Sequence, residues 1–317
     1  MQYNLLGKTG IEVSKLCFGS VTVGPLQANF EEGFAADVIE EAMSLGVNFL
    51  DTAHLYDNYS IIRNALDRLS DREKLVIATK ASVDKDKDYS VHIEEARHEL
   101  NRDVIDIFLL HGEEDKNSLK EHQKALDTLW TYKSKGKIRA VGLSTHYIAG
   151  VYAAIDAGLD VIHPIINKDG LGIVDGRVEQ MEEAIKAANE NGLGIYAMKV
   201  LGGGNFLNRA SECLTYAINH PYFDSIALGM KTKEEVRADV SFFEKGSFTE
   251  EELQYFMQSG KKLLIENINC KGCGKCVEFC HQNALSLQNG IASCNFSKCL
   301  LCGYCSTVCP VFCIRVV

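Results

Sequence analysis

The C-terminal part of the chain holds cysteines whose spacing is suited to binding iron–sulfur clusters. Ten of the 12 cysteines lie between Cys270 and Cys313. Residues 270–280 follow the pattern C-x2-C-x2-C-x3-C, and residues 299–309 repeat it 29 positions later. In such a run three thiolates bind one cuboidal cluster, and the fourth binds the other cluster of the pair. We therefore predict two [4Fe–4S] clusters, one on Cys270, Cys273, Cys276 and Cys309 and one on Cys299, Cys302, Cys305 and Cys280.

Two other roles for these cysteines fit the sequence less well. Zinc is also bound by four cysteines, but zinc sites use paired C-x2-C units and not a C-x2-C-x2-C triplet. A disulfide framework needs an oxidising compartment, and the N-terminus lacks the apolar region of a secretory signal. We accordingly expect a cytoplasmic protein with reduced thiols. The additional Cys294 and Cys313 are expected to serve as packing residues.

Four residues in the first half of the chain form a set suited to carbonyl reduction. Asp51, Lys80 and His111 each end a short apolar stretch, and Tyr56 follows Asp51 by five positions. A tyrosine protonates a developing alkoxide efficiently when its pKa lies below the ordinary value of about 10. A lysine cation would stabilise the phenolate, and an aspartate would hold that cation in place. The imidazole of His111 would donate a hydrogen bond to the carbonyl oxygen.

The elements that must position these residues follow a repeating pattern. Short apolar stretches alternate with amphipathic ones, which indicates a parallel sheet buried on both faces. Eight such units over roughly 250 residues are typical of a (β/α)8 barrel, whose active site lies at the C-terminal ends of the strands. The predicted strands are 15–19, 47–51, 75–80, 105–111, 138–143, 161–166, 194–198 and 225–228, and the predicted helices include 34–45, 91–100, 119–134 and 178–189.

Charge and glycine spacing argue against several other classes of protein. Lys and Arg total 33 against 43 Asp and Glu, a formal net charge of −10, so we expect no binding to nucleic acid or to a membrane surface. The longest charge-free run, 279–297, contains too many polar residues to span a bilayer. Residues 19–24 lack the spacing of a dinucleotide-binding loop, and residues 7–9 lack the earlier glycine of a phosphate-binding loop.

Residues 1–262 resemble the aldo-keto reductase family, whose catalytic tetrad matches Asp51, Tyr56, Lys80 and His111. Residues 268–317 resemble the bacterial two-cluster ferredoxins, except that position 281 is a histidine where that family usually has proline. The resemblance implies a barrel domain at 1–264 and a small α+β ferredoxin-like domain at 265–317.

The same resemblance implies that the barrel binds NADP or NAD. Glu235 stands where the family has an arginine that grips the 2′-phosphate, and Met198 replaces an aromatic residue that stacks on the nicotinamide. Cations at Lys231, Lys233 and Arg237 could compensate for Glu235, so the sequence slightly favours NADP. The residues expected to contact the cofactor are Ser144, His163, Asn167, Met198, Lys199, Leu201, Gly203, Gly229, Met230, Lys231, Thr232 and Arg237.

The expected function is oxidoreduction between a small-molecule carbonyl and its alcohol, dependent on NAD(P)(H). One alternative is a metal hydrolase that uses His54, His111, His146 and His163, although the H-x-H pair after the first strand is missing. Another is a non-catalytic electron-transfer or scaffold protein, against which the intact tetrad argues.

The role of the clusters is a separate question, because a nicotinamide delivers two electrons at once and a [4Fe–4S] cluster passes one. Such couplings normally use a flavin, for which the sequence shows no signature. The C-terminal domain either closes the barrel mouth or relays electrons to or from a redox partner protein, and the complete set of eight ligands favours relay.

Overall fold

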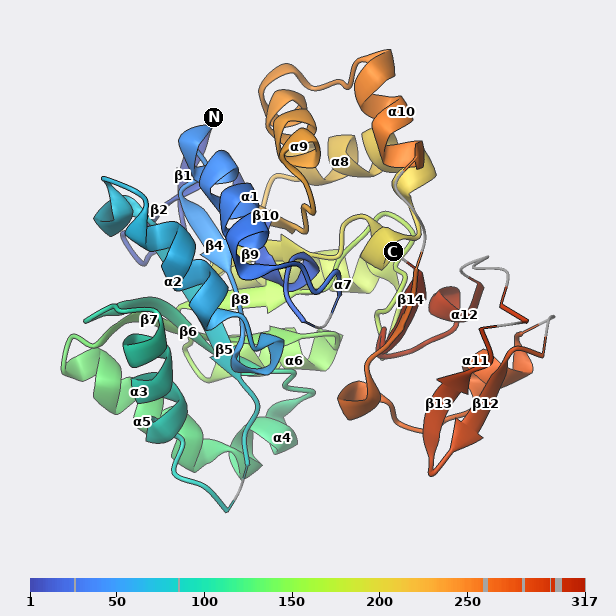
Figure 1. Cartoon of the computed structure of the whole chain (residues 1–317). Coiled ribbons are helices and arrows are strands. Elements are labelled where there is room, and N and C mark those ends of the chain that lie inside the picture. Colours follow the sequence, from blue (N-terminus) through green and yellow to red (C-terminus); the bar gives the residue numbers. More distant parts are fainter. Residues whose placement is uncertain are drawn as a thin grey trace.

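Eight parallel strands close into a barrel in this computed structural model, which describes residues 1–25, 27–84, 86–258, 262–280, 283–296, 298–299 and 304–316. The strands pair in chain order, and the last pairs with the first to close the barrel (Figure 1). The strands are β3 (Leu16–Gly19), β4 (Phe49–Asp51), β5 (Val76–Ala81), β6 (Ile105–His111), β7 (Ile138–Thr145), β8 (Val161–Pro164), β9 (Gly194–Met198) and β10 (Ser225–Leu228).

Helices surround the barrel, and those next to the strands bury one apolar side against them. In α1, for example, Ala35, Val38, Ile39 and Ala42 are buried, which is the spacing of one helix face. The helices are α1 (Glu32–Ser44), α2 (Tyr59–Asp67), α3 (Ser90–Glu99), α4 (Lys116–Glu121), α5 (Gln123–Ser134), α6 (Ile148–Asp156), α7 (Val178–Glu190), α8 (Ala210–Asn219), α9 (Lys233–Lys245) and α10 (Glu250–Gln258).

An antiparallel hairpin closes the end of the barrel at which the strands begin. It is formed by β1 (Tyr3–Leu5) and β2 (Glu12–Ser14). Leu6 and Ile11 in its turn are buried in the same apolar cluster as the side chains inside the barrel. Gly7 has a φ of +52°, and a Cβ there would lie 2.3 Å from the Gly194 nitrogen, so this close approach requires glycine.

The predicted (β/α)8 class is confirmed, and the eight predicted strands are all present. The predicted helix 119–134 is instead two helices, α4 and α5. Asp115 caps α4 by accepting hydrogen bonds from backbone amides, which starts the helix three residues earlier. The break falls at His122, whose Nδ1 lies 2.8 Å from Glu113 Oε1.

A small C-terminal module packs on the barrel (Figure 1). Two two-stranded antiparallel sheets and two short helices form it. The predicted boundary at 264/265 falls inside its first strand. The elements are β11 (Leu263–Ile265), which pairs with β14 (Ile314–Val316), the hairpin β12 (Leu285–Gln288) and β13 (Ile291–Cys294), α11 (Lys275–Glu278) and α12 (Tyr304–Thr307).

Phe312 anchors the module to the barrel. Its side chain is 1% exposed and belongs to the apolar core between the barrel strands and helices. A Cβ on Gly172 would lie 1.8 Å from the Phe312 ring, and one on Gly203 would lie 3.0 Å from it. The loops after β8 and β9 therefore accept the ring only because both positions are glycine.

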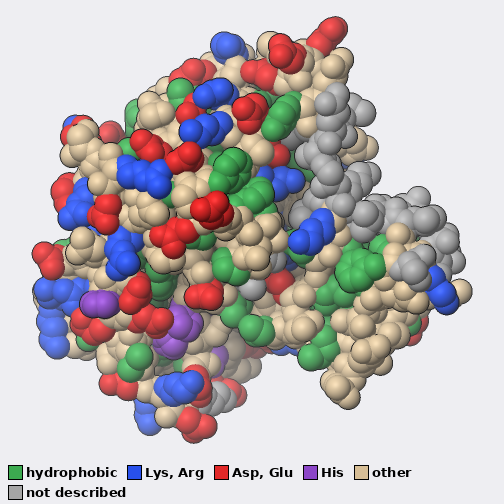
Figure 2. Space-filling view, in the orientation of Figure 1, with side chains coloured by type: hydrophobic (Ala, Val, Ile, Leu, Met, Phe, Trp, Pro, Cys, Tyr) green, Lys and Arg blue, Asp and Glu red, His purple; other side chains and the backbone are tan. Residues whose placement is uncertain are grey.

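One face of the barrel carries intermixed charges. On the face in Figure 2, acidic and basic side chains alternate over the barrel helices instead of separating into patches of one sign. None of the helices in the described part of the chain has the length and apolar character that a bilayer-crossing segment requires.

Candidate active site

Asp51 and Lys80 form a buried ion pair at the C-terminal ends of β4 and β5. The Lys80 Nζ donates to both carboxylate oxygens of Asp51 at 2.7 Å and to the carbonyl oxygen of Thr52 at 2.9 Å. Lys80 is 1% exposed and Asp51 4%. The lysine remains a cation despite its burial, because the charge of Asp51 and their hydrogen bond raise its pKa above the ordinary value.

Tyr56 lies near the Asp51–Lys80 pair and belongs to a short 3₁₀ turn, η2 (His54–Tyr56), that follows β4. The Lys80 Nζ lies 5.0 Å from the centre of the Tyr56 ring. Burial raises the pKa of Tyr56 above 10, although the charge of Lys80 and its hydrogen bond act to lower that pKa. The lowered pKa expected from the sequence is therefore not found, because desolvation outweighs the lysine. Tyr56 is a protonated acid here.

His111 completes the group at the end of β6. Its ring centre lies 6.2 Å from that of Tyr56, with the planes at 84°. Burial and the nearby Lys80 charge hold the pKa of His111 well below its usual range, so the imidazole is neutral. Its Nδ1 is buried and has no hydrogen-bond partner among the described residues. Such a nitrogen is available to a bound molecule.

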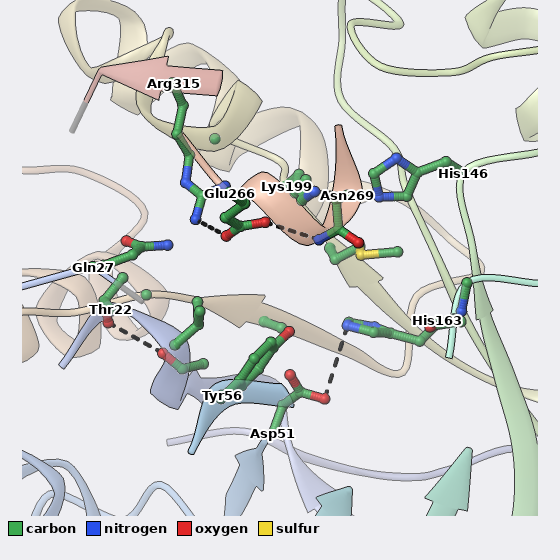
Figure 3. Close-up of a pocket in the computed structure, with 18 of the residues that line it drawn as sticks. Thr22, Gln27, Asp51, Tyr56, His146, His163, Lys199, Glu266, Asn269 and Arg315 are labelled. Atoms are coloured by element: carbon green, nitrogen blue, oxygen red, sulfur yellow. Dashed lines mark hydrogen bonds and ion pairs between the residues drawn. The ribbon is translucent and has the colours of Figure 1, made fainter. Parts of the chain in front are cut away.

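These four residues line one cavity of about 460 Å³ at the barrel mouth. The C-terminal module forms part of the cavity wall through Glu266, Asn269 and Arg315. Arg315 pairs with Glu266, which also accepts a hydrogen bond from Asn269 at 3.0 Å. Figure 3 shows these module residues across the cavity from Tyr56. Closure of the barrel mouth was one of the two roles that the sequence left open for the module, and these lining residues were not identified from it.

Lys199 lies where the barrel and the module meet. Its Nζ is 3.2 Å from His146 Nε2 and 4.7 Å from the centre of the Phe312 ring. Burial and the charge of Arg315 lower the pKa of Lys199 to about 7. This lysine lines the cavity and would gain charge on contact with an anionic group.

The structure brings most of the residues predicted to contact the cofactor to the cavity and leaves four elsewhere. Asn167 bonds to the backbone of Leu171, and Met230 is buried in the apolar core. Thr232 caps α9, and Arg237 pairs with Glu41 at 2.7 Å. Those that line the cavity are Ser144, His163, Met198, Lys199, Leu201, Gly203, Gly229 and Lys231.

Tyr196, inside the barrel, was missed by sequence reasoning. Its hydroxyl donates to Asp51 Oδ2 at 3.0 Å, and its ring stacks on His163 with centres 3.8 Å apart. The His163 Nε2 lies 3.9 Å from Asp51 Oδ2, and burial lowers the pKa of His163 to about 4. Because Tyr196 lies within the apolar stretch of β9, its sequence context predicts only a packing role.

A nicotinamide dinucleotide fits the polar groups of this cavity. Unpartnered buried atoms lie in residues that line it: His111 Nδ1 within the group just described, and Asp239 Oδ1 on α9 beside the loop of Lys231. A polar ligand that reaches both regions would satisfy both atoms.

The module brings together the cysteines of the first predicted cluster. Burial and the neighbouring thiols of Cys309, Cys270 and Cys273 raise the pKa of Cys276, so Cys309 of the second run lies near the cysteines of the first. The backbone amide of Ala292 donates to Cys270 Sγ at 3.4 Å. Thiols gathered around an apolar core fit an iron–sulfur cluster.

The second predicted cluster is described in part. Cys280, Cys299 and Cys305 belong to the same apolar cluster of the module, while Cys302 and the unusual His281 lie outside the described residues. The additional Cys294 lies beside Cys299 and Cys280, and Cys313 Sγ is 3.5 Å from Cys309 Sγ.

Comparisons with known proteins agree with this architecture. A model of the aldo/keto reductase family matches residues 15–212, and a model of the 4Fe-4S binding domain matches residues 295–315. The first covers more than half of the chain, so the chain belongs to the aldo/keto reductase family. It is an oxidoreductase of that family with a C-terminal 4Fe–4S motif.

Individual relatives are distant. The chain is 23% identical to the uncharacterized oxidoreductase YqkF of Bacillus subtilis over 308 residues, covering 83% of this chain and 97% of that protein. It is 28% identical to L-galactose dehydrogenase of Arabidopsis thaliana over 154 residues, covering 45% and 48%. The aldo-keto reductase AKR11C1 from Bacillus halodurans has the same fold, with a TM-score of 0.64 at 20% identity over 81% of this chain and 96% of that one.

Proposed function

We propose that this protein reduces a small-molecule carbonyl compound to its alcohol with a nicotinamide cofactor. The observation that supports it best is the shared cavity in which protonated Tyr56 faces the Asp51–Lys80 pair and neutral His111. The cofactor, when bound, supplies a hydride to the carbonyl carbon. Tyr56 donates its hydroxyl proton to the carbonyl oxygen, so that hydride and proton together convert C=O to CH–OH.

The other residues hold this proton transfer in place. Lys80 stabilises the phenolate that Tyr56 leaves behind, because a cation lowers the free energy of the adjacent anion. Asp51 fixes Lys80 by two hydrogen bonds. Neutral His111 orients the carbonyl oxygen by donating a hydrogen bond to it.

The test is NADH and NADPH oxidation by anaerobically purified protein with a panel of aldehydes, ketones and sugars. We expect oxidation that depends on the carbonyl compound and yields the alcohol in equal amount. If no compound in a broad panel supports turnover while a nucleotide still binds, the non-catalytic alternative is favoured instead.

The rate of reduction should be nearly independent of pH between about 7 and 10. The acid Tyr56 must be protonated, and burial raises its pKa above 10, so kcat falls only as pH rises beyond that value. His111 must be neutral, and its lowered pKa keeps it so down to well below 6.5. A pH–rate profile checks this, and a loss of kcat between pH 7 and 9 would contradict the assignment of Tyr56.

We further propose that the cofactor is NADH, against the slight preference for NADP expected from the sequence. Glu235 lines the cavity and accepts a hydrogen bond from the Lys231 amide at 2.6 Å. Two expected compensating cations already pair elsewhere, Arg237 with Glu41 at 2.7 Å and Lys233 with an aspartate at 3.8 Å. Lys231 also lines the cavity, but its Nζ lies 4.0 Å from Glu235 Oε1, so its charge is shared with that carboxylate, which would repel a 2′-phosphate.

The kcat/KM for NADH should exceed that for NADPH at least about tenfold, or about 1.4 kcal/mol. Glu235→Gln removes the carboxylate that repels the 2′-phosphate. It should therefore raise kcat/KM for NADPH and lower the ratio of kcat/KM for NADH to that for NADPH. An equal or higher kcat/KM for NADPH in the wild type would overturn the NADH assignment.

We propose that the C-terminal module closes the barrel mouth and also relays electrons to or from a redox partner protein. The closure rests on its residues in the cavity wall, such as Glu266 and Arg315. The relay rests on the gathered cysteines, which would hold clusters that supply one-electron transfer.

Protein loaded with about eight irons per chain should form alcohol from NAD⁺ and the carbonyl when reduced viologen is added. Two viologens supply two electrons, which with one proton convert NAD⁺ to NADH, and the mixture without viologen should form no alcohol. The control omits NAD⁺. If the clusters are reduced and turnover does not change, the relay is wrong and closure remains.

A further inference from the structure

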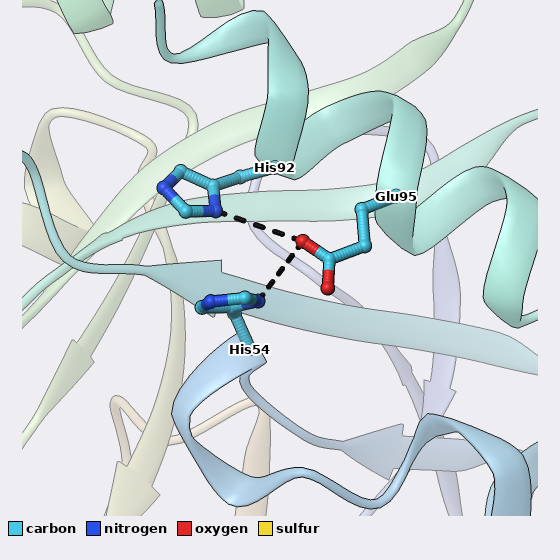
Figure 4. A group of neighbouring side chains, drawn as sticks. All are labelled: His54, His92 and Glu95. Atoms are coloured by element: carbon cyan, nitrogen blue, oxygen red, sulfur yellow. Dashed lines mark ion pairs between the residues drawn. The ribbon is translucent and has the colours of Figure 1, made fainter. Parts of the chain in front are cut away.

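Two histidines and a glutamate converge on the outer side of the barrel mouth. His54 belongs to η2, while His92 and Glu95 lie three positions apart on α3 and so on one helix face. Figure 4 shows both imidazoles turned toward the Glu95 carboxylate. The cavity that contains Tyr56 is lined by other residues of the described chain and not by these three. This cluster plays no part in the proposed reaction.

The spacing of the three groups matches that of ligands around one metal ion. The Nδ1 atoms of His54 and His92 lie 3.1 Å and 3.9 Å from the same oxygen, Glu95 Oε2, and all three ligand atoms are within 4.8 Å of one another. Two ligands of a tetrahedral zinc ion lie about 3.4 Å apart, since each is about 2.1 Å from the ion.

Hydrogen bonding within the cluster leaves one group unsatisfied. Glu95 Oε2 lies 3.1 Å from His54 Nδ1 in an ion pair, but His92 Nδ1 is 3.9 Å from that oxygen, too far for a hydrogen bond. It is buried and has no hydrogen-bond partner among the described residues. Buried polar atoms are nearly always paired in proteins, so this unpaired imidazole nitrogen beside a carboxylate is available to a ligand such as a cation.

We propose that His54, His92 and Glu95 bind a zinc ion. Imidazole nitrogens favour zinc over magnesium or calcium, which prefer oxygen ligands. Three protein ligands leave the fourth tetrahedral position to water, and the side chains of His54 and Glu95 are 40% and 38% exposed, so the ion can enter from solvent.

The ion would join the turn that carries Tyr56 to helix α3. His54 begins η2 and Tyr56 ends it, so a metal bond at one end restrains the backbone at the other. This positioning role rests on the proposed function of Tyr56, whereas the zinc site itself does not.

Zinc titration of cluster-loaded protein by anaerobic calorimetry tests the site, with iron assayed before and after to show that the clusters stay intact. We expect one zinc ion per chain at this site. His92→Asn and Glu95→Gln should each weaken its binding by at least about tenfold. His98→Asn is the matched control, because His98 on the same helix lies 3.0 Å from Glu99 but belongs to no group of three possible metal ligands in the described part of the chain.

Absence of saturable binding, or binding that His92→Asn leaves unchanged, would overturn the site. The restraint is tested separately by hydrogen exchange. Zinc should slow amide exchange in residues 53–57 of the wild type and not of His92→Asn. Binding without slower exchange would overturn the positioning role, and this result does not depend on enzymatic activity.

Discussion

Replacing Tyr56 with phenylalanine is expected to lower kcat for carbonyl reduction by about 10²- to 10⁴-fold, the usual contribution of a positioned general acid. The ring and its packing remain, so the variant should fold and bind the nucleotide as the wild type does. Steady-state kinetics with the best carbonyl of the panel, together with nucleotide titration, measure both quantities. The absorbance of the clusters should not change, because Tyr56 belongs to the barrel.

Tyr59→Phe is the matched control for this change. Tyr59 lies three positions later and is also buried, but its hydroxyl bonds to Thr79 at 2.6 Å and does not line the cavity. We expect its loss to cost about 1 kcal/mol of stability and little kcat. If Tyr56→Phe keeps most of its kcat, another group is the proton donor.

Replacing Lys80 with methionine should damage both folding and catalysis. The change leaves the Asp51 carboxylate buried without its cation, which typically costs 3–5 kcal/mol in the free energy of unfolding. It also removes the charge and hydrogen bond that oppose the raised pKa of Tyr56, so the phenolate becomes harder to form. Thermal unfolding and kcat of Lys80→Met measure the two effects.

A double variant separates these effects. In Asp51→Asn/Lys80→Met the buried charge is gone, so much of the lost stability should return, while carbonyl reduction should stay impaired because Tyr56 still lacks its cation. Recovery of kcat along with stability would mean that Lys80 serves the fold alone.

Polar residues at the ends of apolar stretches made three members of the candidate site predictable from the sequence. Asp51, Lys80 and His111 each close an apolar stretch, and parallel strands in register bring such ends together. The eight strands were predictable for a separate reason, because each is an apolar run of ordinary strand length.

Long-range packing explains what the sequence did not reveal. Tyr196 and Glu266 reach the site from a strand interior and from the C-terminal module, and neither carries a local pattern. The cations Lys233 and Arg237 were expected near the cofactor but pair with acids of α1, a neighbour that sequence spacing does not identify. The pKa of Tyr56 depends on desolvation, which only the folded chain determines.

Transfer of deuterium from NADH labelled at the reactive C4 position tests the central claim most directly. Hydride transfer to a carbonyl held by Tyr56 and His111 predicts an alcohol with one deuterium on its carbinol carbon, as measured by mass spectrometry. When Tyr56 is phenylalanine, the same labelled alcohol should form about 10²- to 10⁴-fold more slowly. An alcohol that forms at full rate from labelled NADH but carries hydrogen from the solvent would contradict direct transfer at this site.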